Sequence, residues 1–194
     1  MSNKEILIKL RQQTGAGIMD IKEALEQAGN DQAKAVEFLR KKGQKMSAKR
    51  AERVAGEGFI GSYVHSNGKV ASMVLLRCET DFVARNSEFQ SLAKDLAMHI
   101  TAANPLYIKP EDIPLPVIEK EKEIYIEDIK REQKPESMAE KIIQGKLEKF
   151  FEDACLLNQK FIKDDSKKIK DLIDEATAKI GEKIEISGFS RLEI

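Results

Sequence analysis

The 194-residue chain contains no tryptophan and only two histidines and two cysteines, so it has few of the side chains that bind metals or act as nucleophiles. Cys78 and Cys155 do not form a CxxC pair, and neither has metal-type spacing with His65 or His99. The chain also lacks a Walker A motif, and nothing indicates a Ser–His–Asp or Cys–His pair. We therefore predict no catalytic residues, no metal site and no cofactor.

The sequence also shows no excess of charge of one sign and no long hydrophobic run. Lys and Arg together number 33, as do Asp and Glu, so the overall charge predicts binding neither to nucleic acid nor to an anionic membrane. The polar start of the chain lacks the apolar segment of a signal peptide, and we expect a soluble, cytoplasmic protein. The two cysteines have apolar neighbours and are expected to be reduced core residues, with an inter-chain disulfide as the alternative.

Apolar residues at helical spacing predict three short helices near the N-terminus. Thr14-Gly15-Ala16-Gly17 separates the first two, Gly29-Asn30 ends the second, and Gly43 is expected to end the third. Residues 1–43 are thus predicted to form a compact three-helix domain. The basic residues 44–56 are predicted to be a partly helical linker, with a phosphate-binding arm as the alternative.

An alternating pattern typical of strands begins at residue 57. A first strand is followed by Asn67-Gly68, a strong hairpin signal, and by a more apolar strand up to Cys78. A third strand is predicted in residues 183–192. With the helices between them, these strands predict an α+β core over residues 57–194.

Four helices are predicted within this core. A long helix starts with the capping box Ser87-Glu88-Phe89-Gln90. Two helices at about 116–131 and 136–152 are joined by a short loop, so they should pair as an antiparallel hairpin. The last helix is expected to begin at the Asp165-Ser166 cap and to end at Gly181.

Gly56-Glu57-Gly58-Phe59-Ile60-Gly61 matches the GxGxxG pattern of dinucleotide-binding loops. Such a loop has to follow a strand and open a helix, so that its backbone N–H groups face phosphates. Here the glycines begin a strand, and no βαβ unit surrounds them. We therefore interpret them as residues that ease a tight start of the strand.

A polar turn from Glu79 to Asn86 contains a single bulky apolar residue, Phe82. Because the capping box starts the long helix at Ser87, residues 81–85 are predicted to form a separate short turn. Phe82 is then out of register with the apolar face of that helix, which makes it a candidate for contact with a partner. Packing in the core is the alternative that register alone leaves open.

The segment between the first two helices is a second candidate for binding. Its glycines let the chain turn tightly, which is a sufficient structural explanation for them. They also leave the backbone and the apolar Ile18 and Met19 near the surface, where these residues could form a patch for a partner.

Two blocks resemble bacterial translation elongation factor Ts: residues 10–20, with Thr14-Gly15-Ala16-Gly17-Ile18-Met19-Asp20, and Glu79-Thr80-Asp81-Phe82-Val83-Ala84-Arg85-Asn86. Later segments agree with the same family in the same order: Lys134-Pro135-Glu136, residues 141–150 with Gly145, Leu157-Asn158-Gln159-Lys160-Phe161 and Lys179-Ile180-Gly181-Glu182. The resemblance covers essentially the whole chain.

The resemblance implies a ubiquitin-associated-type three-helix domain, a linker and a core of antiparallel strands packed by helices, from which the helical hairpin 116–152 projects. It also implies guanine-nucleotide exchange on elongation factor Tu. The family binds the GDP form of that partner, expels GDP and lets GTP load, without being a catalyst or needing a cofactor. Direct binding to nucleic acid or membrane is not expected.

The resemblance also assigns roles to residues. Thr80, Asp81, Phe82 and Val83 match the segment that disturbs the Mg²⁺ site of the partner, with Phe82 as the wedge. Other residues match regions that contact the same partner domain: Thr14, Gly15, Gly17, Ile18, Met19, Ile180 and Gly181.

Compared with the longer family pattern, the chain is expected to carry one strand–helix core unit rather than two and to lack the C-terminal helical module after Ile194. Short members are thought to act as homodimers, so a homodimer is expected. Two other functions stay open: an adapter that binds ubiquitin-like domains through the three-helix domain, and an RNA-binding protein that uses the basic residues 41–53.

Overall fold

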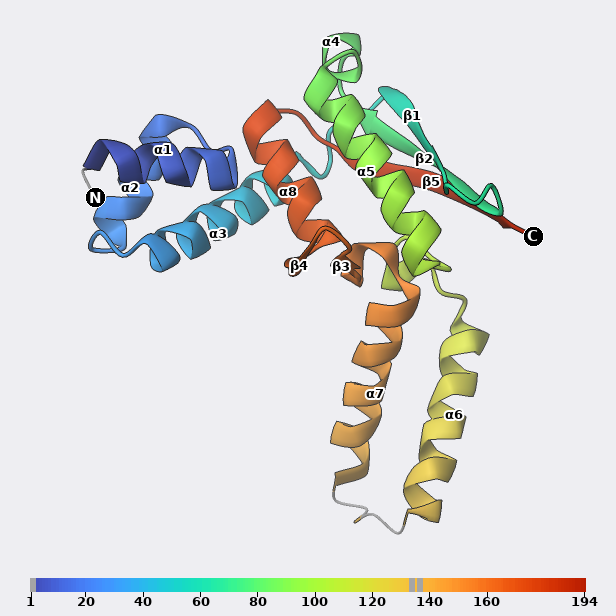
Figure 1. Cartoon of the computed structure of the whole chain (residues 1–194). Helices are drawn as coiled ribbons and strands as arrows, with labels where there is room; N and C mark the ends of the chain where they lie inside the picture. The colour runs from blue at the N-terminus through green and yellow to red at the C-terminus, as the bar shows by residue number, and fades with distance from the viewer. Residues whose placement is uncertain (1–2, 133–134, 136–137) are drawn as a thin grey trace. The chain divides into compact units, whose positions relative to one another are not determined.

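The computed structural model describes residues 3–132, 135 and 138–194. The fold is α+β, as predicted, and consists of two compact units, Met1–Met98 with Lys170–Ile194, and His99–Ile169 (Figure 1). The first unit contains a three-stranded antiparallel sheet, and the second contains a helical hairpin and a two-stranded ribbon. No helix in the described part of the chain is long and apolar enough to cross a membrane.

Three helices pack around a small apolar core at the N-terminal end, as predicted: α1 (Asn3–Thr14), α2 (Ile18–Gln27) and α3 (Gln32–Arg50). Each helix contributes buried side chains to this core: Leu10, Ile21, Ala24, Leu25, Ala35 and Leu39. Full burial of a side chain such as Leu10 or Ile21 stabilises the fold by about 1.5–3 kcal/mol. Asp31 caps α3, since its Oδ1 accepts the backbone N–H of Ala33 at 2.9 Å.

Helix α3 continues through Gly43 to Arg50, so the predicted helix end at Gly43 is wrong. Gly43 is buried against α8 (Ile169–Ile180), where an added Cβ would lie 3.5 Å from the backbone O of Asp174. This packing offsets the roughly 1 kcal/mol by which glycine disfavours a helix interior. The first half of the predicted linker 44–56 is therefore helical, and its assignment as a separate segment stays a prediction.

The sheet has the strand order β1–β2–β5 with antiparallel neighbours: β1 (Glu57–Val64), β2 (Val70–Cys78) and β5 (Glu185–Glu193). The predicted hairpin joins the first two strands. Gly68 adopts a φ of 66° and donates its N–H to His65 O at 2.8 Å. Because β1 leads into β2 rather than into a helix, the GxGxxG pattern does not form a phosphate loop.

Helix α5 (Ser87–Ala103) covers one face of this sheet (Figure 1). Ser72 Oγ donates to Ala97 O at 2.5 Å, and an added Cβ at Gly61 would overlap the backbone carbonyl of Ala93. Only glycine permits this close approach. The other face of the sheet exposes large apolar side chains: Ile60, Val64, Met73 and Leu192.

In the second unit, α6 (Leu115–Arg131) and α7 (Ala139–Ala154) pair as the predicted helical hairpin. The start predicted at residue 136 lies outside the described residues. Asp128 on α6 accepts from Lys146 Nζ on α7 at 2.8 Å, and this ammonium also lies 5.1 Å from the centroid of the Tyr125 ring. Two short 3₁₀ helices, Pro110–Asp112 and Leu156–Asn158, belong to the same unit.

The helix predicted to begin at Asp165-Ser166 begins instead at Ile169. The residues before it form β4 (Asp164–Lys168), which pairs with β3 (Lys160–Phe161). Asp164 Oδ1 accepts from the backbone N of Ser166 at 3.2 Å, a local turn that uses the same residue types as a helix cap. The predicted end of the helix at Gly181 is confirmed, with a φ of 87°.

Cys78 and Cys155 are buried free thiols, as predicted. Burial raises the pKa of each thiol to about 11, so both stay protonated at neutral pH and are poor nucleophiles.

Candidate partner-binding site

The candidate site centres on α4 (Asp81–Ala84), a single helical turn between β2 and α5. Thr80 is its N-cap, and the Thr80 hydroxyl accepts from Val83 N at 3.5 Å. Ala84 is buried beneath the turn, whereas Phe82 is 82% exposed. The predicted separation of this turn from the long helix is confirmed, and Phe82 does not pack in the core.

The cap of α5 differs from the predicted capping box. Asn86, rather than Ser87, supplies the side-chain acceptor, since its Oδ1 takes the N–H of Glu88 at 2.8 Å. The side chain of Gln90 reaches past the cap and donates to Ala84 O at 3.2 Å. The predicted helix start at Ser87 is right. The hydrogen bond from Gln90 to Ala84 O connects α5 to the turn before it.

Two glutamates hold the turn against the loop that follows α8. Glu182 Oε2 accepts from the backbone N of Glu79 at 3.1 Å and of Thr80 at 3.0 Å, and Glu182 Oε1 accepts from Thr80 Oγ1 at 2.7 Å. In the opposite direction, Glu79 Oε1 accepts from the backbone N of Lys183 at 2.6 Å. We call these four hydrogen bonds the carboxylate clasp.

Basic groups support the Glu79 half of the clasp. Arg53 NH1 lies 3.4 Å from Glu79 Oε2, and Lys183 Nζ donates to Arg53 O at 3.0 Å. The Lys183 backbone N–H, together with the Arg53 charge, holds the pKa of Glu79 below its usual range. Glu79 is therefore a carboxylate at neutral pH, the form that accepts these bonds.

The second predicted group lies at the turn between α1 and α2. The Thr14 hydroxyl donates to the carbonyl one helical turn earlier at 2.7 Å, Gly15 adopts a φ of 67°, and Gly17 is the N-cap of α2. The first two residues of α2 are left at the surface, with Ile18 46% and Met19 75% exposed. The first unit thus exposes an apolar pair, Ile18 and Met19, in addition to Phe82.

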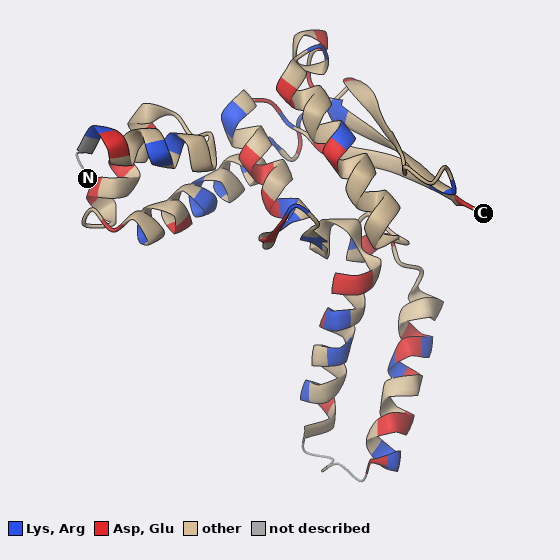
Figure 2. Ribbon diagram, in the orientation of Figure 1, with Lys and Arg blue, Asp and Glu red and all other residues tan. Residues whose placement is uncertain are grey.

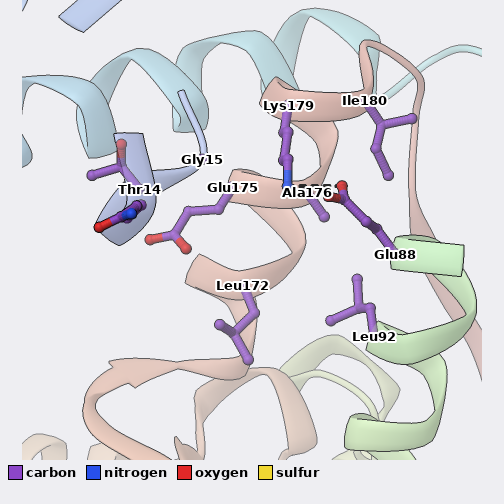
Figure 3. A pocket seen from close by; sticks show the side chains of 10 residues that line it. Thr14, Gly15, Glu88, Leu92, Leu172, Glu175, Ala176, Lys179 and Ile180 are labelled. Carbon is purple, nitrogen blue, oxygen red and sulfur yellow. Dashed lines mark ion pairs between the residues drawn. The ribbon is translucent and has the colours of Figure 1, made fainter. Parts of the chain in front are cut away.

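A pocket of about 250 Å³ lies beside the second group, between α1, α5 and α8 (Figure 3). Its lining comes from α1, α5, α8 and the first turn: Gln12, Thr14, Gly15, Glu88, Leu92, Leu172, Glu175, Ala176, Lys179 and Ile180. Lys179 Nζ pairs with Glu88 at 2.7 Å, and the Lys179 side chain runs over Gly15, where an added Cβ would lie 3.0 Å from its Cδ. Ile180, the last residue of α8, lines this pocket, and Glu182, two residues later, takes part in the clasp.

The side chains of this region are of types that suit binding to another protein. In the described ranges, no group of three or more His, Cys, Asp or Glu side chains is arranged to hold a metal ion. The exposed apolar side chains of Phe82, Ile18 and Met19 can bury area against another protein. No sequence pattern indicated a role for Glu79 or Glu182, although Glu182 directly follows the predicted helix end at Gly181.

Comparison with known proteins identifies the relatives of this chain. A family profile described as Elongation factor TS matches residues 4–194. The chain is 55% identical over 190 residues to the elongation factor Ts of Thermotoga sp. (strain RQ2), which covers 98% of this chain and 94% of the relative. The elongation factor Ts of Thermosipho melanesiensis is 53% identical over 194 residues, which covers 100% and 99%. That of Thermodesulfovibrio yellowstonii is 55% identical over 190 residues, covering 98% and 94%. The chain therefore belongs to the elongation factor Ts family of translation elongation factors.

Proposed function

We propose that this chain promotes guanine-nucleotide exchange on elongation factor Tu. It binds the GDP-bound and nucleotide-free forms of that partner, disturbs the partner's Mg²⁺ site and releases GDP so that GTP can load. Membership of the family supports a role in translation elongation, and exchange is the activity that the resemblance implies. The chain acts by binding and makes or breaks no covalent bond.

The observation that carries the proposal is the exposure of Phe82 on a turn that is fixed from its other side. Phe82 is 82% exposed, while the neighbouring Thr80 is held by Glu182. Because the backbone of the turn is already held, binding has to order only the Phe82 side chain and not the segment that carries it. Burying Phe82 in the partner would contribute about 1.5–3 kcal/mol.

Exchange follows from differential binding. A protein that binds the nucleotide-free partner more tightly than the GDP form must weaken GDP binding by the same factor. The burial energy of Phe82 corresponds to about one to two decades in an equilibrium constant, and it weakens GDP binding to the extent that it is gained only in the nucleotide-free complex. The rest has to come from Asp81, which pairs with Arg85 at 3.0 Å on the exposed side of the turn, and from the second group with Ile18 and Met19.

Ion pairs made by several of the basic residues 41–53 favour the exchange function over RNA binding. Lys41 pairs with Glu37 at 2.7 Å, and Lys42 pairs with Asp20 at 2.9 Å as well as with a second carboxylate. Arg53 forms an ion pair with Glu79. Cations that are already paired within the chain release fewer counterions on binding phosphates, which lowers the affinity for nucleic acid.

One assay tests the proposal against its rivals. Elongation factor Tu loaded with a fluorescent GDP analogue is mixed with excess GDP, with and without this chain. We expect the chain to accelerate release of the analogue at micromolar concentration. No acceleration would contradict the proposal. Binding to a ubiquitin-like domain, or an RNA affinity that falls steeply with salt, would then favour one of the alternatives.

We also infer that the chain forms a homodimer through the open face of its sheet. Ile60, Met73 and Leu192 are 60%, 51% and 70% exposed on that face. Figure 2 shows charges of both signs along the helices, whereas β1 and β2 each contain one charged residue. A second copy offers the same weakly charged apolar face, and pairing through a twofold axis would bury both faces together.

A further inference from the structure

The carboxylate clasp continues the connection between β2 and β5 beyond the end of their backbone ladder. The last backbone pair of these strands is Arg77 with Glu185. Beyond it, the N–H groups of Glu79 and Thr80 donate to the Glu182 carboxylate rather than to a backbone carbonyl. The path of the chain into α4 is therefore set by one side chain from a segment more than 100 residues away.

The end of α8 directs Glu182 toward the turn. Gly181 donates its N–H to Thr177 O at 3.0 Å and adopts a φ of 87°, which reverses the chain after Ile180. L side chains rarely adopt this conformation, so glycine is required for the reversal. The residue that follows then has both carboxylate oxygens within hydrogen-bond distance of Thr80.

We propose that Glu182 is a positioning residue for partner binding: its carboxylate fixes Thr80, and through Thr80 the orientation of the helical turn that presents Phe82. This inference rests on the proposed exchange function. Thr80 is both the N-cap of α4 and the residue that gives two donors to Glu182. Because Phe82 is 82% exposed, the direction of its side chain depends on the backbone of the turn.

The first test compares substitutions in the exchange assay. Glu182→Ala removes every acceptor of this half of the clasp, and we expect exchange per mole of chain to fall about tenfold or more, because a misoriented turn loses the contact that Phe82 makes with the partner. Glu182→Gln keeps a carbonyl oxygen for the two backbone N–H groups and an amide that can donate to the Thr80 hydroxyl, so it should recover most of the activity. Glu152→Gln is the control, since Glu152 belongs to the second unit, accepts from Lys168 Nζ at 2.8 Å and takes no part in the clasp.

The second test needs no partner protein. The chain has no tryptophan, so Phe82→Trp creates a single fluorescent reporter on the turn. We expect the fluorescence anisotropy of this reporter to fall when Glu182→Ala is added, with little change when Glu152→Gln is added. For Glu182→Ala, the midpoint of thermal unfolding, followed by circular dichroism, should change little, while the exchange activity falls.

The outcomes separate the two proposals. If the unsubstituted chain fails to accelerate release of the GDP analogue, the proposed function is wrong, and the anisotropy alone decides whether Glu182 orders the turn. If the unsubstituted chain is active and Glu182→Ala is equally active, or if the anisotropy is unchanged, the positioning role is overturned. Loss of activity in both Glu182→Ala and Glu182→Gln, with a matching loss of stability, also overturns it in favour of a purely structural role.

Discussion

At the scale of single residues, two phenylalanines in adjacent helices have opposite environments. Phe89 on α5 is fully buried against the sheet, whereas Phe82 on α4 is 82% exposed. A single exposed apolar residue is common in proteins. Phe82, however, lies on a turn whose backbone and Thr80 hydroxyl donate three hydrogen bonds to Glu182, which suits it for binding a partner.

Phe82→Ala should leave the fold intact and weaken exchange by about tenfold or more, since it removes most of the transfer energy of one aromatic side chain. The free energy of unfolding should change by less than about 0.5 kcal/mol, because the side chain buries little area in the free chain. Exchange kinetics and denaturant unfolding measure the two effects. Phe89→Ala is the control and should cost about 3–5 kcal/mol of stability. A comparable loss for Phe82→Ala would show that Phe82 belongs to the core.

The carboxylate of Glu79 should make the clasp pH-dependent. Its pKa is lowered in the folded chain, chiefly by the Lys183 N–H, so it contributes stability above its ordinary unfolded pKa, and this stability is lost as the pH falls through the lower folded value. Glu79→Gln should therefore be less stable than the unsubstituted chain at pH 7, with the difference shrinking in acid below about pH 4.3. Thermal unfolding across this range measures the difference, and a difference that persists at the acid end would contradict the assignment.

At the scale of elements, the packing of α5 on the sheet depends on a missing side chain. The backbone of α5 approaches β1 so closely at Gly61 that an added Cβ would meet the carbonyl of Ala93. Backbone atoms cannot rotate away as the end of a flexible side chain can, so the helix itself has to shift.

Gly61→Ala should therefore destabilise the chain by roughly 1–3 kcal/mol through overpacking. Gly188→Ala is the matched control in β5: an added Cβ there meets nothing within 4 Å. It should change stability by no more than about 0.5 kcal/mol. Denaturant unfolding of both variants checks the prediction, and equal effects would mean that strand propensity rather than helix packing determines the cost.

At the scale of the whole molecule, the open sheet face is the surface to test for self-association. Ile60→Glu places a charge on that face and should convert a dimer into a monomer in sedimentation equilibrium at micromolar concentration, with an unchanged circular dichroism spectrum. Val54→Glu is the control, because Val54 is 84% exposed but lies outside the strands. A monomer mass for the unsubstituted chain would contradict the homodimer.

Much of the local structure was predictable because local spacing decides it. The three N-terminal helices, the Asn67-Gly68 hairpin, the start of α5 at Ser87 and the end of α8 at Gly181 are all found. Phe82 was selected as a contact candidate from register alone, and its exposure agrees with that choice, while its role stays a prediction.

Two of the errors, at Asp165-Ser166 and at Gly43, share one cause. Asp164 and Ser166 form a local turn that resembles a helix cap, and only the pairing of β3 with β4 distinguishes the two. Gly43 resembles a helix end, but α8 packs against it, and this contact is invisible in the sequence of α3. In both places a tertiary neighbour decided between two local structures of similar free energy.

The sequence by itself determined the order of the longer helices and of the three strands of the sheet, and the isolated position of Phe82, because these depend on spacing within one segment. The tertiary structure alone decided how the turn bearing Phe82 is held. Glu182 and Thr80 are 102 residues apart, and their hydrogen bonds exist only because β2 and β5 pair and Gly181 reverses the chain between α8 and β5. A bond between distant residues follows from the fold, since neither partner has a local sequence pattern that identifies the other.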